Sequence, residues 1–255
     1  MTLDIIGNIA IFKFPDKMKK SRKLREAKKL LKSQPSIKTV LEKSKKVSGR
    51  LRTLKTKFLA GQKTKEALYK ENSCKFKLNI ETCYFSPRLA EERKQVAKEI
   101  KSKEKVLVLF SGVAPFPVVT AKLSGCKDIV AIELSRACNK YAKENLKLNH
   151  VADKIKLIQG DVKKKVNKKL GKFEVIVMPR PNLKETFLKQ AFQVSKKSTR
   201  IFYYCFGKQE NLNKNLAEIY NQARVLGKKI TILKIKKAGE IAPYKFRWRI
   251  DFKVK

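Results

Sequence analysis

Four short segments of the sequence carry residues that could hold a cofactor, and each follows an apolar run. Gly112 lies in the turn after the first run, where it allows the backbone to approach a ligand closely. Glu133 ends the second run, where its carboxylate can accept both hydroxyls of a ribose, and Asp161 after the third can contact an adenine edge. We therefore predict a cofactor that contacts Phe110, Ser111, Gly112, Val113, Glu133, Leu134, Asp161, Val162 and Met178.

The apolar runs are predicted to be the strands of one parallel sheet. They are short and apolar throughout, which is typical of strands covered on both faces, and they alternate with helical patterns. Two later strands, 230–235 and 246–254, are separated by a short loop and should be antiparallel. This α/β arrangement is the architecture of the Rossmann-like class I methyltransferases. The parallel strands are expected at 106–110, 129–134, 155–159, 175–178 and 201–206, with helices at 118–123, 137–148, 185–194 and 211–225.

The competing cofactor is NAD. Glu133 follows the first strand by roughly 20 residues, which is the offset of a ribose-binding acid in a dinucleotide-binding unit. The turn after that strand nevertheless lacks the G-x-G-x-x-G pattern. Gln159-Gly-Asp161 and the Pro-rich segment after Met178 suit S-adenosylmethionine better.

Residues 1–85 are expected to form a separate small α+β domain, and residues 86–255 the cofactor-binding domain. A hairpin is predicted at 4–14 and a basic helix at 17–32. Strands with one cationic face are predicted at 49–59 and 74–80. A helix from Arg88 to Ile100 should follow Ser86-Pro87, a plausible N-cap and first helical residue.

The charge of the chain favours a polyanionic partner. Its 255 residues include 63 Lys and Arg against 22 Asp and Glu, a formal net charge of +41. Such a field concentrates nucleic acid near the protein surface, and residues 17–66 are especially basic. A general bias toward lysine in the proteome is the alternative, because most of these cations are Lys and not Arg.

Metal and membrane sites are not expected. Five cysteines occur without a CxxC pair, and His150 is the single histidine, so no zinc site is predicted. No apolar run is long enough to span a bilayer, and no signal peptide is recognisable. We expect a reduced, soluble, cytoplasmic monomer.

Several motifs together resemble a known family. The run from Tyr84 to Arg93, Tyr-Phe-Ser-Pro-Arg-Leu-Ala-Glu-Glu-Arg, is the most specific of them. With Phe110-Ser-Gly-Val-Ala-Pro-Phe116, Ala131-Ile-Glu-Leu134, Glu144-Asn-Leu-Lys-Leu-Asn149 and Gly160-Asp-Val162, it closely resembles the archaeal and eukaryotic type of tRNA guanine-37 N1-methyltransferase. The likeness covers nearly the whole chain, but the family's N-terminal domain that senses the tRNA corner is expected to be missing.

The resemblance implies tRNA as partner, S-adenosylmethionine as cofactor, and a set of roles. The general base falls on Glu92, and the arginines that position the guanine and stabilise charge fall on Arg52 and Arg88. Guanine N1 needs to lose a proton and O6 gains negative charge, so a carboxylate and a cation are what the chemistry requires. The residues expected to contact the substrate are Tyr84, Arg93, Pro179, Arg180 and Pro181. The alternative for Glu92 is a solvated helix residue paired with a nearby Arg or Lys.

Three positions depart from the family pattern. Val108 replaces an acidic residue, Ala114 replaces a loop glycine, and Pro179 replaces the Asn of an Asn-x-Pro motif that would grip the guanine. Arg180 could offer a new cationic donor in its place. Two other functions therefore stay open: transfer of the aminocarboxypropyl group to a modified tRNA guanosine, and RNA binding without catalysis.

Overall fold

The computed structural model describes residues 1–44 and 53–255. Their packing divides the chain into two compact units, Met1–Pro87 and Arg88–Lys255. The sequence analysis places this boundary after residue 85.

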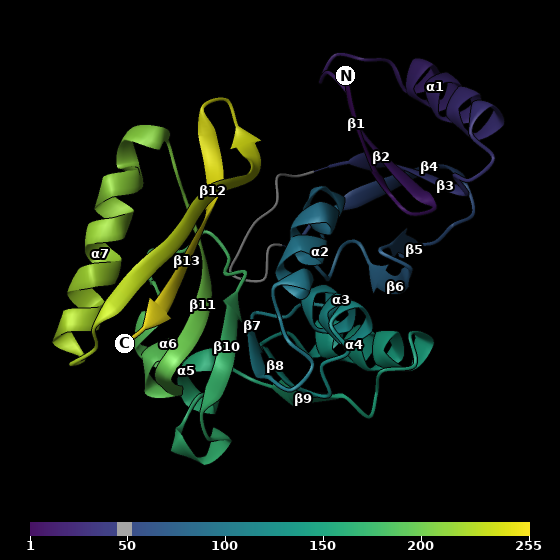
Figure 1. Cartoon of the computed structure of the whole chain (residues 1–255). Coiled ribbons are helices and arrows are strands. Elements are labelled where there is room, and N and C mark those ends of the chain that lie inside the picture. The colour runs from purple at the N-terminus through teal and green to yellow at the C-terminus, as the bar shows by residue number, and fades with distance from the viewer. Residues whose placement is uncertain (45–52) are drawn as a thin grey trace. The chain divides into compact units, whose positions relative to one another are not determined.

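The N-terminal unit contains a four-stranded sheet in the order β1-β2-β3-β4. Strands β2 and β3 are parallel, the other pairs antiparallel, and α1 packs against the sheet (Figure 1). Small and aromatic side chains, among them Ala27 of α1 and Phe12 of β2, fill the space between them. A separate hairpin, β5-β6, follows. The elements are β1 (Thr2–Ile6), β2 (Ile9–Lys13), α1 (Lys20–Ser33), β3 (Thr39–Lys43), β4 (Thr56–Gly61), β5 (Glu66–Glu71) and β6 (Cys74–Asn79).

The second unit is a seven-stranded sheet in the order β12-β13-β11-β10-β7-β8-β9. Neighbours from β11 to β9 are parallel, whereas β13 is antiparallel to both β11 and β12. Helices α2, α3 and α4 lie on one side of this sheet and α5, α6 and α7 on the other (Figure 1). Its strands are β7 (Lys105–Leu109), β8 (Asp128–Glu133), β9 (Ile155–Gln159), β10 (Phe173–Met178), β11 (Ser195–Gly207), β12 (Ile230–Ala242) and β13 (Lys245–Val254).

Two apolar layers cover this sheet because successive side chains of a strand point to opposite faces. Leu107 and Leu109 of β7 belong to the layer that also contains Leu188 of α6 and Ile219 of α7. The helices are α2 (Ala90–Lys98), α3 (Pro115–Leu123), α4 (Arg136–Leu148), α5 (Val162–Lys165), α6 (Leu188–Gln193) and α7 (Leu212–Val225), with short 3-10 helices η1 (Pro87–Leu89), η2 (Lys168–Leu170) and η3 (Gln209–Asn211).

The predicted α/β class, with a parallel sheet and an antiparallel C-terminal hairpin, is confirmed. Strands β3 and β5 were not predicted, because both are short and rich in charged residues, which hides the apolar alternation. The helix expected after Ser86-Pro87 begins instead as a 3-10 turn at Pro87, and Leu89 is the N-cap of α2. Of the strand predicted at 49–59, residues 49–52 lie outside the described residues, and β4 begins at Thr56.

The described residues contain neither a membrane-spanning helix nor a cluster of metal ligands. No helix within 1–44 and 53–255 is long and apolar enough to cross a membrane. In the same ranges no group of three or more His, Cys, Asp or Glu side chains could hold a metal ion.

The turn between β1 and β2 depends on glycine at position 7. Gly7 has a φ of +57°, and a β-carbon there would lie 2.0 Å from the carbonyl oxygen of Leu68. Gly227 has a similar φ of +64°, but nothing lies within 4 Å of the same added atom. The two glycines therefore separate the cost of the backbone conformation from the cost of the contact.

We expect Gly227→Ala to cost about 1 kcal/mol, which is the left-handed conformation alone. Gly7→Ala should cost about 3 kcal/mol or more, because the hairpin must also move away from Leu68. Native-state hydrogen exchange of the most protected amides in each unit measures both. Equal costs would show that the contact with Leu68 relaxes freely.

Candidate active site

The turn after β7 is shaped by three residues in the left-handed conformation. Phe110, Gly112 and Ala114 have φ values of 57°, 58° and 66°. The Ser111 N–H donates to the carbonyl of Ile132 at 3.0 Å, which ties the turn to the neighbouring strand β8. A left-handed alanine costs roughly 1 kcal/mol relative to glycine, so Ala114 keeps at a cost the conformation that a glycine would adopt freely. Pro115 then begins α3.

Glu133 joins the ends of β7 and β8. Its Oε2 accepts the Gly112 N–H at 2.8 Å, and its Oε1 accepts the Ser135 N–H at 2.8 Å. Burial raises the pKa of this carboxyl, against the lowering effect of these backbone donors. These fixed backbone donors orient the carboxylate before any ligand binds.

Asp161 lies at the end of the next strand, β9. Its Oδ1 accepts the Lys163 N–H at 2.9 Å, which caps the short helix α5. The preceding Gly160 N–H donates to the carbonyl of Glu133 at 2.8 Å. The ends of β7, β8 and β9 are thus connected by backbone hydrogen bonds, and the three predicted cofactor segments lie together.

The segment after β10 is held by Arg180. Its guanidinium donates to the carbonyls of Leu183 at 2.9 Å and Glu185 at 2.8 Å, and it lies 5.4 Å from the ring centroid of Tyr203. The Arg180 N–H donates to the carbonyl of Met178 at 2.7 Å. Arg180 is buried, and its guanidinium is bound by carbonyl groups of its own loop.

Glu92 of α2 lies at the same end of the sheet. In the register of the parallel pair, Met178 of β10 is opposite Tyr203 of β11. The next residue, Tyr204, points to the other face, where its hydroxyl donates to Glu92 Oε1 at 2.8 Å. Its ring centroid lies 5.9 Å from that of Phe116, in the first turn of α3. Glu92 is therefore linked through Tyr204 to β11, beside the end of β10, and to the first turn of α3.

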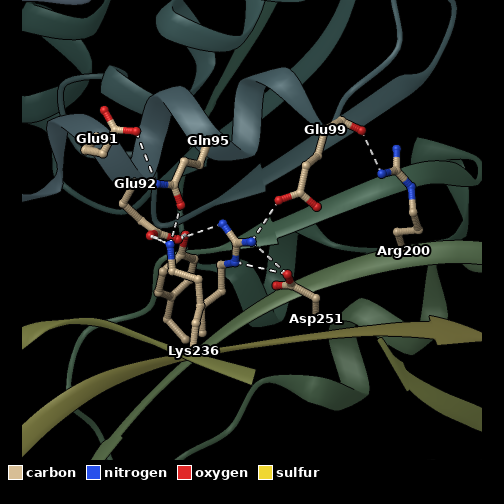
Figure 2. A network of polar contacts seen from close by, with 9 residues as sticks. Glu91, Glu92, Gln95, Glu99, Arg200, Lys236 and Asp251 are labelled. Carbon is tan, nitrogen blue, oxygen red and sulfur yellow. Dashed lines mark hydrogen bonds and ion pairs between the residues drawn. The ribbon is translucent and has the colours of Figure 1, made fainter. Parts of the chain in front are cut away.

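Two cations pair with the buried carboxylate of Glu92 (Figure 2). Arg249 Nη1 of β13 donates to Oε1 at 2.9 Å, and Lys236 Nζ of β12 lies 2.7 Å from Oε2. Burial raises the pKa of Glu92, but the Lys236 hydrogen bond, the Arg249 charge and the Tyr204 hydroxyl outweigh it, so the pKa lies below its usual value. Glu92 is ionised at neutral pH.

Arg249 is itself surrounded by carboxylates. It is fully buried and donates to Glu99 at 2.8 Å and to Asp251 Oδ2 at 2.8 Å. Burial raises the pKa of Asp251 to about 6 even though Arg249 opposes the shift. The network of Glu92, Glu99, Arg249, Asp251, Lys236 and Tyr204 joins α2 to β11, β12 and β13 (Figure 2).

Comparison with known protein families identifies this arrangement. The TRM5/TYW2 methyltransferase domain matches residues 67–232, and the TYW2 N-terminal domain matches residues 3–64. The chain belongs to the TRM5/TYW2 methyltransferase family. Its fold is therefore that of a methyltransferase, as the motifs from Tyr84 to Val162 predict.

Two curated relatives match almost the whole chain. A Pyrococcus abyssi protein named tRNA (guanine(37)-N(1))-methyltransferase Trm5b is 32% identical over 99% of this chain and 74% of its own length. A Nanoarchaeum equitans protein named tRNA (guanine(37)-N(1))/4-demethylwyosine(37)-methyltransferase Taw22 is 33% identical over 98% of this chain and 99% of its own length.

Solved structures of family members superpose closely. A complex of aTrm5 with tRNALeu has a TM-score of 0.86 at 25% identity, and covers 100% of this chain and 72% of that one. Methanocaldococcus jannaschii Trm5 in complex with adenosine has a TM-score of 0.82 at 25% identity, with coverages of 100% and 74%.

The other residues that the family resemblance implies lie in different places. Arg52 lies outside the described residues. Arg88 is in η1 directly before α2, in the same unit as Glu92, whereas Tyr84 belongs to the N-terminal unit. Arg93 is buried, and its guanidinium lies 6.0 Å from the ring centroid of Phe116. Substrate contacts by these residues and by Pro179, Arg180 and Pro181 stay predictions.

Sequence analysis did not find the partners of Glu92. Tyr204, Lys236 and Arg249 follow it by more than 100 residues and belong to no motif. One signal is present in β13, where Arg247, Arg249 and Asp251 alternate with apolar residues although both faces of the strand are buried. Charged residues on such a strand indicate a buried ionic network.

The pKa of Glu92 should rise in Lys236→Met, because the nearest ammonium is removed while Arg249 and Tyr204 remain. Lys237→Met is the matched control, since Lys237 faces Phe246 and Trp248 instead. Carboxyl carbon NMR of labelled glutamate, assigned with Glu92→Gln, measures the pKa.

The same variant should change stability at low pH. Because the pKa of Glu92 is lower in the folded than in the unfolded state, its ionisation stabilises the fold above about 4.5, and that stability is lost as pH falls. The decrease in the free energy of unfolding below pH 4.5 should be smaller in Lys236→Met than in the parent protein. An unchanged pKa and an unchanged acid midpoint would show that Lys236 does not control Glu92.

Proposed function

We propose that this protein transfers the methyl group of S-adenosylmethionine to N1 of guanine 37 in tRNA. The observation that carries the proposal is the position of an ionised carboxylate, Glu92. It lies at the same edge of the sheet as Gly112 and Glu133, which we call the cofactor cradle. The whole-length likeness to proteins named for this reaction supports it.

The residues at the carboxyl ends of β7, β8 and β9 suit an adenosine cofactor. Glu133 offers two oriented oxygens for a ribose diol at the carboxyl edge of the sheet, which is the usual place for such a ligand. The buried Ser111 Oγ has no hydrogen-bond partner within the part of the chain that the structure describes, so a polar ligand group would satisfy it. S-adenosylmethionine supplies a methyl group already activated by the sulfonium.

Glu92 is suited to accept the proton of guanine N1. A carboxylate with a low pKa is a weak base toward neutral guanine, but the N1 proton becomes acidic as the bond from N1 to the methyl carbon forms. Oε2 faces Lys236, whose side chain is partly exposed, and Oε1 is held by the buried Arg249 and Tyr204. The guanine would therefore take the place of Lys236 at Oε2.

The negative charge that develops on guanine O6 requires a nearby cation. The loop after β10 has Pro179 where an Asn side chain could otherwise contact the guanine. Arg88, directly before α2, is the described residue that the family motif assigns to this charge. The carbonyl of Met178, which accepts the Arg180 N–H at 2.7 Å, lies at the end of β10 and could also accept the exocyclic amine of the base.

Methylation of 4-demethylwyosine at the same tRNA position is a second candidate. It is favoured by the relative whose name carries both substrates, which aligns with 98% of this chain and 99% of its own length. The loss of Asn at position 179 also removes a contact expected for a plain guanine. We rank methylation of guanine N1 above this second candidate, because the chain has both Glu92 and Arg88 at the positions that the family motif assigns to that reaction.

Purified protein should form 1-methylguanosine when it is incubated with methyl-labelled S-adenosylmethionine and unmodified tRNA transcripts. Glu92→Gln should lower kcat by about 10²- to 10⁴-fold, because it removes the base but keeps an acceptor for Arg249. Glu210→Gln, at an exposed carboxylate of η3 away from this network, is the control and should retain activity. Nucleoside mass spectrometry identifies the product.

The alternatives give different products in that assay. A label that appears only on tRNA carrying 4-demethylwyosine would support the second candidate. An aminocarboxypropyl mass increase without label would replace methyl transfer by the other reaction of this cofactor. Full activity of Glu92→Gln would exclude Glu92 as the base.

Cofactor binding should depend on Glu133. Glu133→Gln keeps an acceptor for one backbone N–H but loses an oxygen that a ribose hydroxyl requires, so binding of S-adenosylmethionine should weaken about tenfold or more. Glu210→Gln, at an exposed carboxylate of η3, is the control. Isothermal titration calorimetry measures both, and equal affinities would place the ribose elsewhere.

A further inference from the structure

The tip of the β12-β13 hairpin has a composition that folding does not explain. Ala242 pairs with Lys245, so Pro243 and Tyr244 form the turn. Tyr244 has a φ of 58°, although the residue after proline in such a turn is usually Gly or Asn. Its side chain is 78% exposed, so burial does not compensate for the strained backbone. A strained and exposed aromatic residue indicates a role outside the fold.

Both strands of the hairpin carry lysines, Lys245 directly after Tyr244 and Lys237 farther along β12, opposite Trp248. Lys237 and Lys245 are exposed on either side of the tip, and the Lys237 ammonium lies 4.3 Å from the ring centroid of Phe246 and 5.6 Å from that of Trp248. Glu240 is the one acidic side chain between residues 233 and 247, and it accepts the Tyr244 N–H at 3.2 Å. The carboxylate therefore orders the tip, while the lysines keep it positively charged.

The hairpin is continuous with the candidate active site. Lys236, the residue before Lys237 in β12, reaches the carboxylate of Glu92. Successive residues of a strand point to opposite faces, so Lys236 faces α2 while Lys237 faces Phe246 and Trp248. One face of the hairpin thus contacts the candidate active site, and the other face carries Lys237.

We propose that the tip of the β12-β13 hairpin binds RNA, with one base stacked on Tyr244 and neighbouring phosphates paired with Lys237 and Lys245. Single-stranded RNA is recognised by aromatic side chains that stack on bases beside cations that contact phosphates. The positive charge of the tip fits a polyanion better than an apolar protein surface. The inference rests on the proposed function only in naming tRNA as the RNA, and the binding can be measured without catalysis.

Tyr244→Gly tests the proposal without endangering the fold. Glycine adopts the left-handed conformation freely, so thermal stability should be equal or higher. The Kd for a fluorescein-labelled tRNA transcript should nevertheless rise about fivefold or more, because base stacking on an aromatic side chain is lost. Tyr244→Phe should bind as the parent does. Tyr220→Ala, at an exposed tyrosine of α7, is the control and should change nothing.

The lysines give a second readout. Removing Lys237 and Lys245 together should lower the slope of log Kd against log salt concentration by about one to two, as expected for lost phosphate contacts. Affinity for S-adenosylmethionine should stay as in the parent. In the methyl-transfer assay, Tyr244→Gly should raise KM for tRNA and leave kcat at saturating tRNA almost unchanged.

An unchanged Kd for tRNA in Tyr244→Gly and in the double lysine variant would overturn the proposal. A loss of binding together with a loss of thermal stability in Tyr244→Gly would also count against it, because the tyrosine would then be structural. Absence of methyl transfer in the parent protein contradicts the proposed function alone, since anisotropy reports binding independently.

Discussion

The burial of the Arg249 guanidinium among three carboxylates is the constraint on which the arrangement of α2 depends. A charge removed from water is strongly unfavourable unless its hydrogen bonds are made. Glu92, Glu99 and Asp251 make them from α2 and from β13 itself. The helix therefore has a defined rotation and height above the sheet, since either change would leave a buried ion without a partner.

The charges of this network do not balance. Three carboxylates face two cations, Arg249 and Lys236, and Asp251 Oδ1 has no hydrogen-bond partner among residues 1–44 and 53–255. Asp251 is also the member whose pKa rises to about 6. A proton on Asp251 would bring the network to neutrality while Glu92 stays ionised. As pH falls through about 6, Asp251 therefore takes up a proton before Glu92 does.

Sequence reasoning located what is local and missed what is not. Gly112, Glu133 and Asp161 could be found because each follows an apolar strand, and parallel strands bring their carboxyl ends to one edge. The register between β11 and β13 cannot be predicted from local sequence patterns. The contacts of Tyr204 and Arg249 with Glu92 were therefore not predicted. The contacts of the Arg180 guanidinium with carbonyls of its own loop could not be predicted either, because they depend on the conformation of that loop. The left-handed Ala114 likewise follows from the turn around it and not from the preference of alanine, so its conformation could not be predicted from its residue type.

The position of β13 in the sheet has a consequence for how the protein is made. This strand comes after all the others in the sequence, yet it inserts between β11 and β12, and its Arg249 lies 157 positions after Glu92. During synthesis, α2 and the strands around β7 emerge before β12 and β13. The Glu92 carboxylate therefore has neither Lys236 nor Arg249 as a partner until those strands are translated. Contacts of such long sequence separation form late and slowly. The nascent protein should therefore acquire its cofactor cradle early and its ordered Glu92 only when β13 has been translated.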